Sequence, residues 1–278
     1  MPRIVDGATR LLPILGDPIR QVRSPEVLSA LFRANGVNAV CVPVHVLPPD
    51  LPAAVAGLRV VRNAMGFIAT IPHKQAVIPL LDGLTPRSRR VGSANVVRRE
   101  ADGSLTGDIV DGVGFVKGLT RNGQQIAGRR ALVVGSGGVG SAIAFAVAEA
   151  GATSVHVADI LAARAVDLSR RLEAAGTPSG VSPAVAEGFD LIVNASPLGM
   201  KAEDPIPIDC AGLSATAIVC DVVVHPQITP LLAAARKRGC HVQPGTVMMD
   251  YQLEAMREFF PFPEGDYSPE AIARVIAA

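Results

Sequence analysis

Short apolar runs rich in β-branched residues alternate along the chain with longer stretches in which apolar residues recur every three or four positions. The short runs are bounded by Gly, Pro or Asn and are typical of strands, whereas the longer repeats are typical of amphipathic helices. The pattern predicts strands at Leu11–Leu15, Ala39–Val44, Ala64–Ile68, Ala131–Val134, Ser154–Ala158, Leu191–Asn194 and Ile218–Asp221. It predicts helices at Pro25–Asn35, Pro49–Arg62, Lys74–Leu80, Gly140–Ala150, Ala162–Ala175, Thr229–Arg238 and Thr246–Phe259. This alternation predicts an α/β protein built on parallel sheets.

A polar, glycine-containing stretch, Leu119–Arg130, interrupts the alternation just before the most strand-like segment of the chain. Such a stretch is typical of a connection between folded units. The 278 residues are enough for two modest domains, each with its own core. The pattern therefore predicts two α/β units.

The charge balance narrows the range of partners. The chain has 26 basic and 25 acidic residues, a formal charge of +1, so it has no global field that would attract a phosphate backbone or an anionic membrane. Nucleic acid and membrane are therefore not expected as partners. The start of the chain lacks the apolar core of a signal peptide, and no run of about 18 apolar residues follows. We expect a cytoplasmic protein.

The cysteines give no sign of a metal site. The chain has four, without CxxC spacing and without a His at ligand spacing, namely Cys41, Cys210, Cys220 and Cys240. We expect buried thiols in a reducing compartment.

The strongest chemical signal follows the predicted strand Ala131–Val134, where a glycine-rich turn leads into an apolar helix. The turn has the form GxGxxG and consists of Gly135, Ser136, Gly137, Gly138, Val139 and Gly140. The first two glycines of such a turn let backbone N–H groups approach a pyrophosphate at the helix N-terminus, and the third lets the helix pack close to the strand. This motif predicts a dinucleotide site.

Asp159 ends the next predicted strand, close to the spacing of about 20 residues at which an acidic residue meets the adenosine ribose hydroxyls. A carboxylate there repels a 2′-phosphate, and the following Ile160 and Leu161 supply no arginine to bind one. NAD is therefore predicted in preference to NADP. The competing interpretation is that Asp159 only caps the next helix.

Motifs in order along the chain resemble those of the shikimate/quinate dehydrogenase family. GDPIRQVRSP resembles the family's GxPIxHSxSP, TIPHK its NVTxPxK, GSANVV its GAxNT and GDIVDGVG its GxNTDGxG. In the second half, GSGGVGSA is similar to the family's glycine loop, VNASPLGM to NATPxGM, CDVVVHPQITPLL to DxVYxPxxTPLL and PGTVMMDYQ to GxxMLxxQ. Because these motifs span nearly the whole chain in register, the chain is identified as a member of this family.

The resemblance implies two α/β domains. Residues 1–118, completed by C-terminal helices in 245–278, are expected to bind substrate, and residues 119–244 are expected to form a Rossmann domain that binds NAD. The implied reaction moves a hydride between nicotinamide and the ring hydroxyl or ketone of a small alicyclic hydroxy acid, without a metal. The expected assembly is a monomer or a homodimer.

The resemblance also implies roles for individual residues. Lys74 is expected to exchange the hydroxyl proton while Asp111 positions it, although Lys74 could instead only anchor a substrate that Asp111 orders. The implied substrate-binding residues are Ser24, Thr70, Asn95 and Gln252. The implied cofactor-binding residues beyond the glycine loop and Asp159 are Asn194, Ser196, Gly199, Met200, Val222 and Gly245.

Several hydrogen-bonding positions of the family pattern carry other residues here, all but one of them aliphatic. They are Gln21, Val22, Ile68, Val96, Ile109, Val110 and Val224. Each lost hydrogen bond to a polar substrate costs about 1–3 kcal/mol, so efficient use of shikimate itself is in question. Either Ser24 holds the carboxylate with Arg23, Arg20 or His225, or the substrate is a less polar ring.

A non-catalytic module that senses NAD or a metabolite is the remaining alternative. A sensor has no need of a proton-transfer pair, so Lys74 and Asp111 favour an enzyme.

Overall fold

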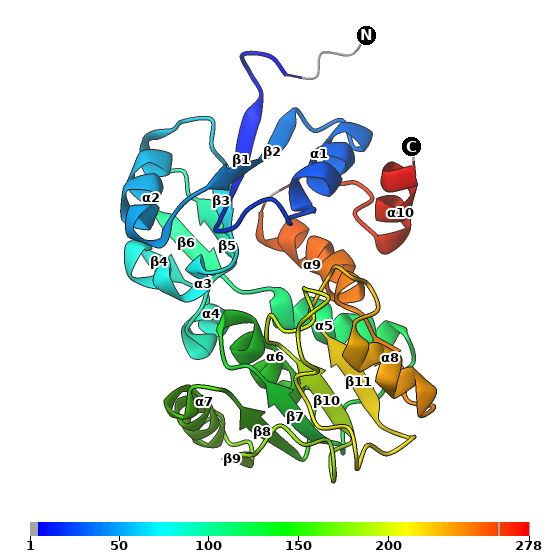
Figure 1. Cartoon of the computed structure of the whole chain (residues 1–278). Coiled ribbons are helices and arrows are strands. Elements are labelled where there is room, and N and C mark those ends of the chain that lie inside the picture. The colour runs from blue at the N-terminus through cyan, green and yellow to red at the C-terminus, as the bar shows by residue number, and fades with distance from the viewer. Residues whose placement is uncertain (1–4, 261, 278) are drawn as a thin grey trace. The chain divides into compact units, whose positions relative to one another are not determined.

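The computed structural model describes residues 5–260 and 262–277, and the chain divides into two compact α/β units (Figure 1). The first unit consists of residues 1–110 with 253–278, and the second of residues 111–252. The predicted boundaries, 118/119 and 244/245, do not coincide with this division. A helix absent from the sequence-based prediction, α5 (Asp111–Arg121), belongs to the second unit and occupies the start of the expected linker.

The first unit is built on a six-stranded mixed sheet in the order β2-β1-β3-β5-β6-β4. Strands β1, β2 and β3 run parallel, β5 is antiparallel to both β3 and β6, and β4 is parallel to β6. The strands are β1 (Arg10–Gly16), β2 (Ala39–His45), β3 (Gly66–Ala69), β4 (Gly83–Leu84), β5 (Val96–Arg99) and β6 (Leu105–Asp108). The α-helices are α1 (Ser24–Ala34), α2 (Leu51–Val60), α3 (His73–Ala76), α4 (Pro86–Val91) and α10 (Pro269–Ala277).

The second unit is built on a six-stranded parallel sheet in the order β12-β11-β10-β7-β8-β9. This is the doubly wound order whose direction reverses between β7 and β10, where a ligand crevice forms at the carboxyl ends of the strands. The strands are β7 (Arg130–Val134), β8 (Ser154–Ala158), β9 (Ser179–Val181), β10 (Leu191–Asn194), β11 (Ile218–Asp221) and β12 (His241–Gln243). The helices are α5, α6 (Gly138–Glu149), α7 (Ala162–Ala174), α8 (Pro230–Lys237) and α9 (Gly245–Phe259), of which α9 continues into the first unit.

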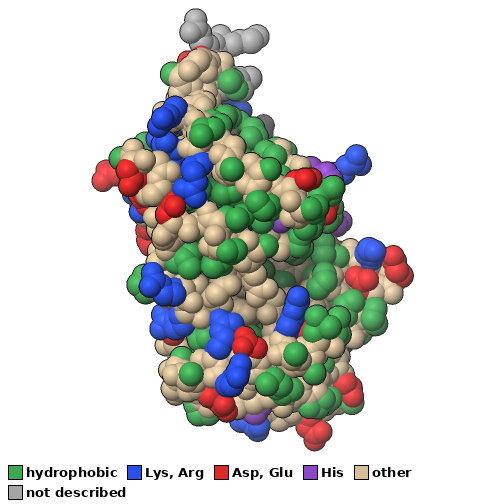
Figure 2. Space-filling view, turned by 90° about the vertical axis from the view of Figure 1, so that its left-hand side faces the viewer, with side chains coloured by type: hydrophobic (Ala, Val, Ile, Leu, Met, Phe, Trp, Pro, Cys, Tyr) green, Lys and Arg blue, Asp and Glu red, His purple; other side chains and the backbone are tan. Residues whose placement is uncertain are grey.

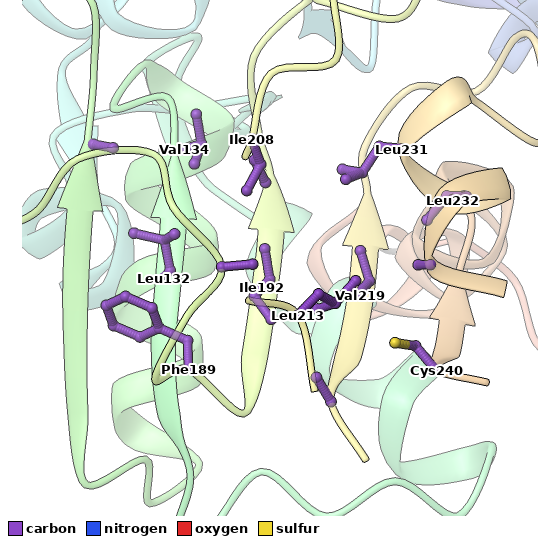
Figure 3. Packing of buried hydrophobic residues seen from close by; sticks show 14 residues of the cluster. Leu132, Val134, Phe189, Ile192, Ile208, Leu213, Val219, Leu231, Leu232 and Cys240 are labelled. Carbon is purple, nitrogen blue, oxygen red and sulfur yellow. The ribbon is translucent and has the colours of Figure 1, made fainter. Parts of the chain in front are cut away.

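Aliphatic side chains dominate the core of the second unit. Leu132 of β7, Ile192 of β10 and Val219 of β11 point to one face of the sheet, where they meet Phe189 and Leu231 (Figure 3). The burial of such side chains, each about 1.5–3 kcal/mol, stabilises the parallel strands on this face. This core keeps the carboxyl ends of β7, β10 and β11 in register, with Val134 and Asp221 both paired to Asn194.

The predicted α/β class and all seven predicted strands are confirmed, while two predicted helices differ in form from the prediction. The segment expected as Lys74–Leu80 is the short helix α3 followed by a 3₁₀ turn at Ile78–Leu80. Pro79 explains the break, because a proline lacks the N–H that an α-helix interior requires. The helix expected at Pro49–Arg62 likewise begins as a 3₁₀ turn, Pro48–Asp50, before α2.

The structure can be compared with the sequence-based expectations for surface charge and for the burial of the four cysteines. Basic and acidic side chains are interspersed on the face shown in Figure 2. Cys41, Cys220 and Cys240 are buried, whereas Cys210 is only half-buried, contrary to the expectation for it. Burial raises the pKa of the Cys41 thiol to about 12. Across the described residues, no helix has the length and apolar character needed to cross a membrane.

Candidate functional site

The glycine loop connects β7 to α6 and lies at the carboxyl end of the second unit's sheet. A Cβ at Gly140 would lie 1.8 Å from the carbonyl oxygen of Gly135, and Gly135 itself has a φ of +101°. Both positions therefore require glycine, one for space and one for backbone conformation. A Cβ at Gly137 would meet nothing within 4 Å. The first turn of α6 thus has open space beside it, where a diphosphate can approach the helix N-terminus.

The glycine loop also contacts the end of β10. A Cβ at Gly135 would lie 2.8 Å from the backbone of Ala195 and 2.9 Å from the nitrogen of Ser196. The Asn194 Oδ1 atom accepts hydrogen bonds from the Ser196 backbone N–H, at 3.0 Å, and from its hydroxyl, at 2.7 Å. The structure therefore brings the predicted cofactor residues Asn194 and Ser196 beside the glycine loop, at the sheet's reversal point.

Asp159 follows β8 and is tied to the same loop. Its Oδ2 accepts hydrogen bonds from the Ser136 N–H, at 2.7 Å, and from the Ser136 hydroxyl, at 2.5 Å, while Oδ1 accepts from the Leu161 N–H at 2.8 Å. Burial acts to raise the pKa of Asp159, but these hydrogen bonds outweigh it and hold the pKa below its usual value. The carboxylate is therefore charged at neutral pH. Ile160, next to it, is 97% exposed.

A buried polar cluster that the sequence motifs did not single out as functional supports this edge of the sheet. Asp221, at the end of β11, accepts hydrogen bonds from Asn194 Nδ2 at 3.0 Å, from the Val223 N–H at 3.0 Å and from the Thr229 hydroxyl at 2.7 Å. Burial raises the pKa of Asp221, and the three hydrogen bonds oppose that rise. Asp221 and Thr229 thus position Asn194. In the sequence, both residues coincide with the Asp and Thr of the family motif DxVYxPxxTPLL, but that motif gave no role for either side chain.

Replacement of Thr229 by Val tests this cluster. Val keeps the shape of the side chain but removes a fully buried hydroxyl, which leaves Asp221 Oδ2 without its donor. We expect the free energy of unfolding to fall by about 1–3 kcal/mol, measured by urea denaturation. Thr216→Val, at an exposed loop position, is the matched control and is expected to change stability by less than about 0.5 kcal/mol. Equal stability of the two variants would contradict the role assigned to Thr229.

Gly245 and Val222, two further predicted cofactor residues, lie against each other. A Cβ at Gly245 would lie 2.4 Å from the carbonyl oxygen of Val222, so α9 begins directly on the chain that leaves β11. Gly199 donates its N–H to Asp204 Oδ2 at 2.9 Å, in the loop after β10. Met200, in the same loop, is 40% exposed and is not a core side chain.

Asp111 and Gln252, predicted from distant motifs, are hydrogen-bonded in the second unit. Gln252 Nε2 donates to Asp111 Oδ1, and both side chains are buried. The packing of α5 makes this contact possible, since a Cβ at Gly112 would lie 2.4 Å from the carbonyl oxygen of Ala142, and one at Gly114 would lie 2.5 Å from that of Met248. Glycines therefore allow α5 to approach α6 and α9 closely. The carboxylate of Asp111 accordingly fixes the amide of Gln252.

The predicted residues of the first unit lie at the carboxyl ends of β1 and β3. Thr70 follows β3 and donates its N–H to the Leu15 carbonyl, while Asn95 precedes the antiparallel β5 and accepts at its backbone oxygen from the Ala69 N–H. Lys74, half-buried on α3, accepts at its backbone oxygen from the Ala94 N–H at 2.8 Å. The fold thus brings Thr70, Lys74 and Asn95 to the same end of the sheet.

In the first unit, Ser24 and the side chain of Asn95 each have a structural role of their own. Ser24 is the first residue of α1, after the loop that leaves β1. Asn95 is buried, and its Oδ1 accepts the Val110 N–H at 3.0 Å, just before Asp111. Lys74 and Asp111 belong to different units, so their catalytic pairing stays a prediction.

Two of the aliphatic departures from the family motifs are neighbours in the first unit's sheet. Ile68 of β3 and Val96 of β5 are register partners and are both buried, and Ile68 also pairs with Ile14 of β1. In this chain, aliphatic residues stand at these two positions where the family pattern has polar ones, and they gain apolar packing in place of the lost hydrogen bonds. Val22 and Val224, in contrast, are half-buried on loops.

The residues present fit a nicotinamide dinucleotide in the second unit. The open space at Gly137 would accommodate the diphosphate, and the N-terminus of α6 would stabilise its charge. The charged Asp159 would accept hydrogen bonds from the ribose hydroxyls. A bound nicotinamide would exchange a hydride with a substrate carbon.

Comparisons with known proteins agree with this assignment. Residues 14–97 match the model of the shikimate dehydrogenase substrate binding domain. The chain is 41% identical over 264 residues to the NADP(+) shikimate dehydrogenase of Rubrobacter xylanophilus, covering 92% of each protein. Shikimate dehydrogenase from Aquifex aeolicus has a TM-score of 0.88 at 27% identity, over 99% of this chain and 100% of that one.

A quinate dehydrogenase from Corynebacterium glutamicum, solved in complex with NAD, has a TM-score of 0.81 at 30% identity, over 97% of this chain and 99% of that one. The predicted two-domain α/β class and the resemblance to shikimate and quinate dehydrogenases are both confirmed by these similarities. The chain belongs to the shikimate dehydrogenase family and is an NAD(P)-dependent oxidoreductase that acts on a CH–OH group.

Proposed function

We propose that this protein is a NAD-preferring dehydrogenase that moves a hydride between nicotinamide and the ring hydroxyl or ketone of a shikimate- or quinate-like alicyclic hydroxy acid. The observation that carries the reaction class is the 41% identity to an NADP(+) shikimate dehydrogenase over nine-tenths of both chains, whereas the NAD preference rests on Asp159 alone. In this proposal the first unit binds the substrate and the second binds the dinucleotide.

Lys74 acts as the acid–base group. When the alcohol is oxidised, the hydride leaves the carbinol carbon for nicotinamide, and the hydroxyl proton is transferred to Nζ of Lys74. Asp111 orients the reacting groups, while the Gln252 amide that it holds contacts the substrate. Thr70, Asn95 and Ser24 supply further hydrogen bonds to the ring substituents.

A less polar alicyclic alcohol is the second candidate substrate. The aliphatic side chains at 22, 68, 96 and 224 favour it, because a ring with several hydroxyls would leave some of them without partners. If the substrate does carry a carboxylate, Ser24 would bind it together with Arg23, Arg20 or His225.

Initial rates of dinucleotide reduction test the function. The purified protein is assayed with shikimate, quinate and a panel of less hydroxylated cyclohexane and cyclohexene carboxylates and alcohols, each with NAD and with NADP. Turnover of shikimate or quinate would support the first candidate, and turnover confined to the less polar rings would support the second. An absence of turnover throughout, despite measured NAD binding, would contradict both.

The preference for NAD rests on the residues after β8. Asp159 is ionised at neutral pH and repels a 2′-phosphate, and Ile160 offers no positive charge to offset that repulsion. The curated relatives favour NADP in this respect, since the Rubrobacter and Moorella thermoacetica proteins are named for NADP(+), whereas the Corynebacterium protein was solved with NAD. Arg164 is the nearest basic residue along the chain after Asp159, and its charge contributes to lowering the Asp159 pKa.

Replacement of Ile160 by Arg is expected to change the cofactor preference. Ile160 packs against almost nothing, so the variant should fold normally, and its guanidinium would offer a charge-assisted hydrogen bond to a 2′-phosphate. We expect kcat/KM with NADP to rise about tenfold, equivalent to about 1.4 kcal/mol, with little change for NAD. Val166→Arg adds the same charge at a half-exposed position on α7 and controls for net charge. A tenfold preference of the wild-type protein for NADP would contradict the cofactor proposal.

A further inference from the structure

A cavity of about 190 Å³ lies in the first unit, at the end of the sheet opposite to the predicted substrate residues. Its lining includes Arg10, which begins β1, Arg62, which precedes β3, and Arg98 and Arg99, which end β5. The substrate residues Thr70 and Asn95 lie at the other ends of β3 and β5. The cavity is therefore separate from the site described above.

Among the residues that the structure describes, four arginines and no carboxylate line this cavity. Arg98 is neutralised by Glu100, at 2.7 Å, and also donates to the Phe259 carbonyl. Arg99 donates its Nε to the carbonyl of Arg59, which does not cancel its charge. Within the described part of the chain, Arg10 and Arg62 have neither a hydrogen-bond acceptor nor an ion-pair partner for their guanidinium groups. Three of the four guanidinium groups are thus not paired with a carboxylate, and those of Arg10 and Arg62 are open to solvent.

Two buried donors beside the cavity also lack acceptors among the described residues. The hydroxyl of Tyr267, whose side chain is 2% exposed, and the Nε of Arg257 are both without a hydrogen-bond partner. Tyr267 stacks on Phe262, which lines the cavity, with ring centroids 6.0 Å apart. Burial raises the pKa of Tyr267, and the charges of Arg257 and Arg10 partly offset the rise. A buried donor without an acceptor costs about 1–3 kcal/mol, and although neither of these two groups lines the cavity, both add to the excess of donors around it.

We propose that this arginine cavity binds a small phosphate monoester or free phosphate. Guanidinium groups pair with phosphate in a bidentate geometry, and a phosphate dianion matches two or more uncompensated arginines better than a carboxylate does. The volume is more than ten times the roughly 10–15 Å³ that one water needs, so there is room for an organic group beyond the phosphate. Phe262, which keeps some exposed surface, supplies an apolar wall for that group.

Calorimetric titration of the full chain with phenyl phosphate tests the proposal. NAD is kept at saturation so that the glycine loop is not a competing phosphate site, and ionic strength is held constant. We expect the Kd to rise at least tenfold in the double variant Arg10→Gln/Arg62→Gln and to stay at the wild-type value in Arg33→Gln. Arg33 is exposed on α1 in the same unit and controls for the loss of charge.

Inorganic phosphate is titrated in parallel to identify the source of the phosphate group. Tighter binding of phenyl phosphate would assign an organic monoester, and equal affinities would assign free phosphate. Either outcome supports the proposed phosphate site if the double variant loses this binding while it keeps the thermal unfolding and the NAD affinity of the wild-type protein. Absence of binding, or equal binding by the wild-type protein and a folded double variant, would overturn the proposal. None of these outcomes depends on which substrate the enzyme uses.

Discussion

Replacement of Lys74 by Met is expected to lower kcat roughly 10²–10⁴-fold, the range that a positioned acid–base group contributes. Met has nearly the length of the lysine side chain but cannot take or give a proton. The backbone of Lys74 bonds to Ala94, and that contact does not depend on the side chain, so the local structure should survive. Steady-state kinetics with the best substrate of the panel, at saturating dinucleotide, measures the effect.

The division between kcat and KM separates the two roles considered for Lys74. An acid–base role predicts that kcat falls while KM changes little, whereas an anchoring role predicts that KM rises and kcat is largely kept. Gln75→Met, at the exposed neighbouring position of α3, is the matched control and should retain wild-type kinetics. A Lys74→Met enzyme with wild-type kcat would exclude the acid–base role.

Replacement of Gly140 by Ala is expected to destabilise the protein by about 3 kcal/mol and to abolish measurable dinucleotide binding. The new Cβ would lie 1.8 Å from the Gly135 carbonyl oxygen, which belongs to rigid backbone and not to a flexible side chain. Either the glycine loop or the start of α6 must therefore move, at the typical cost of overpacking. Urea denaturation and calorimetric titration with NAD measure the two effects.

Gly137→Ala provides the comparison for this result. Gly137 has a φ of −67° and open space around its Cβ position, so alanine there should leave stability unchanged to within about 0.5 kcal/mol. The same open space is the place proposed for the diphosphate, so NAD should bind at least about tenfold more weakly. If Gly137→Ala bound NAD as the wild-type protein does, the proposed path of the diphosphate along this loop would be wrong.

The fold was predictable wherever one segment carried its own pattern. Ser154–Ala158, Leu191–Asn194 and Ile218–Asp221 have the same bounds in the sequence-based prediction and in the structure, because each is centred on β-branched residues that are buried in a parallel sheet. Helix α5 was missed because its glycines at 112, 114 and 118 lower helix propensity. Those glycines are present because neighbouring helices approach closely there, and a local pattern does not reveal this.

The candidate site shows the same division. The glycine loop and Asp159 follow from spacing within one βαβ unit, so short-range sequence was sufficient to identify them. Asp221 and Thr229 were missed as positioning residues because their common partner is the buried Asn194, and only the pairing of β10 with β11 brings these groups together.

The sequence by itself determined the α/β class and the dinucleotide loop, because each depends on residue order within short segments, and it determined the family through short motifs that follow one another in order along the chain. Only the tertiary structure placed Gln252 on Asp111 and gathered Arg10, Arg62 and Arg99 around one cavity. Both features join residues that are far apart in the chain. The hydrogen bond of Asp111 depends on its burial, and the cavity depends on which charged groups have no partner. Such quantities are defined only when the strands and helices have packed.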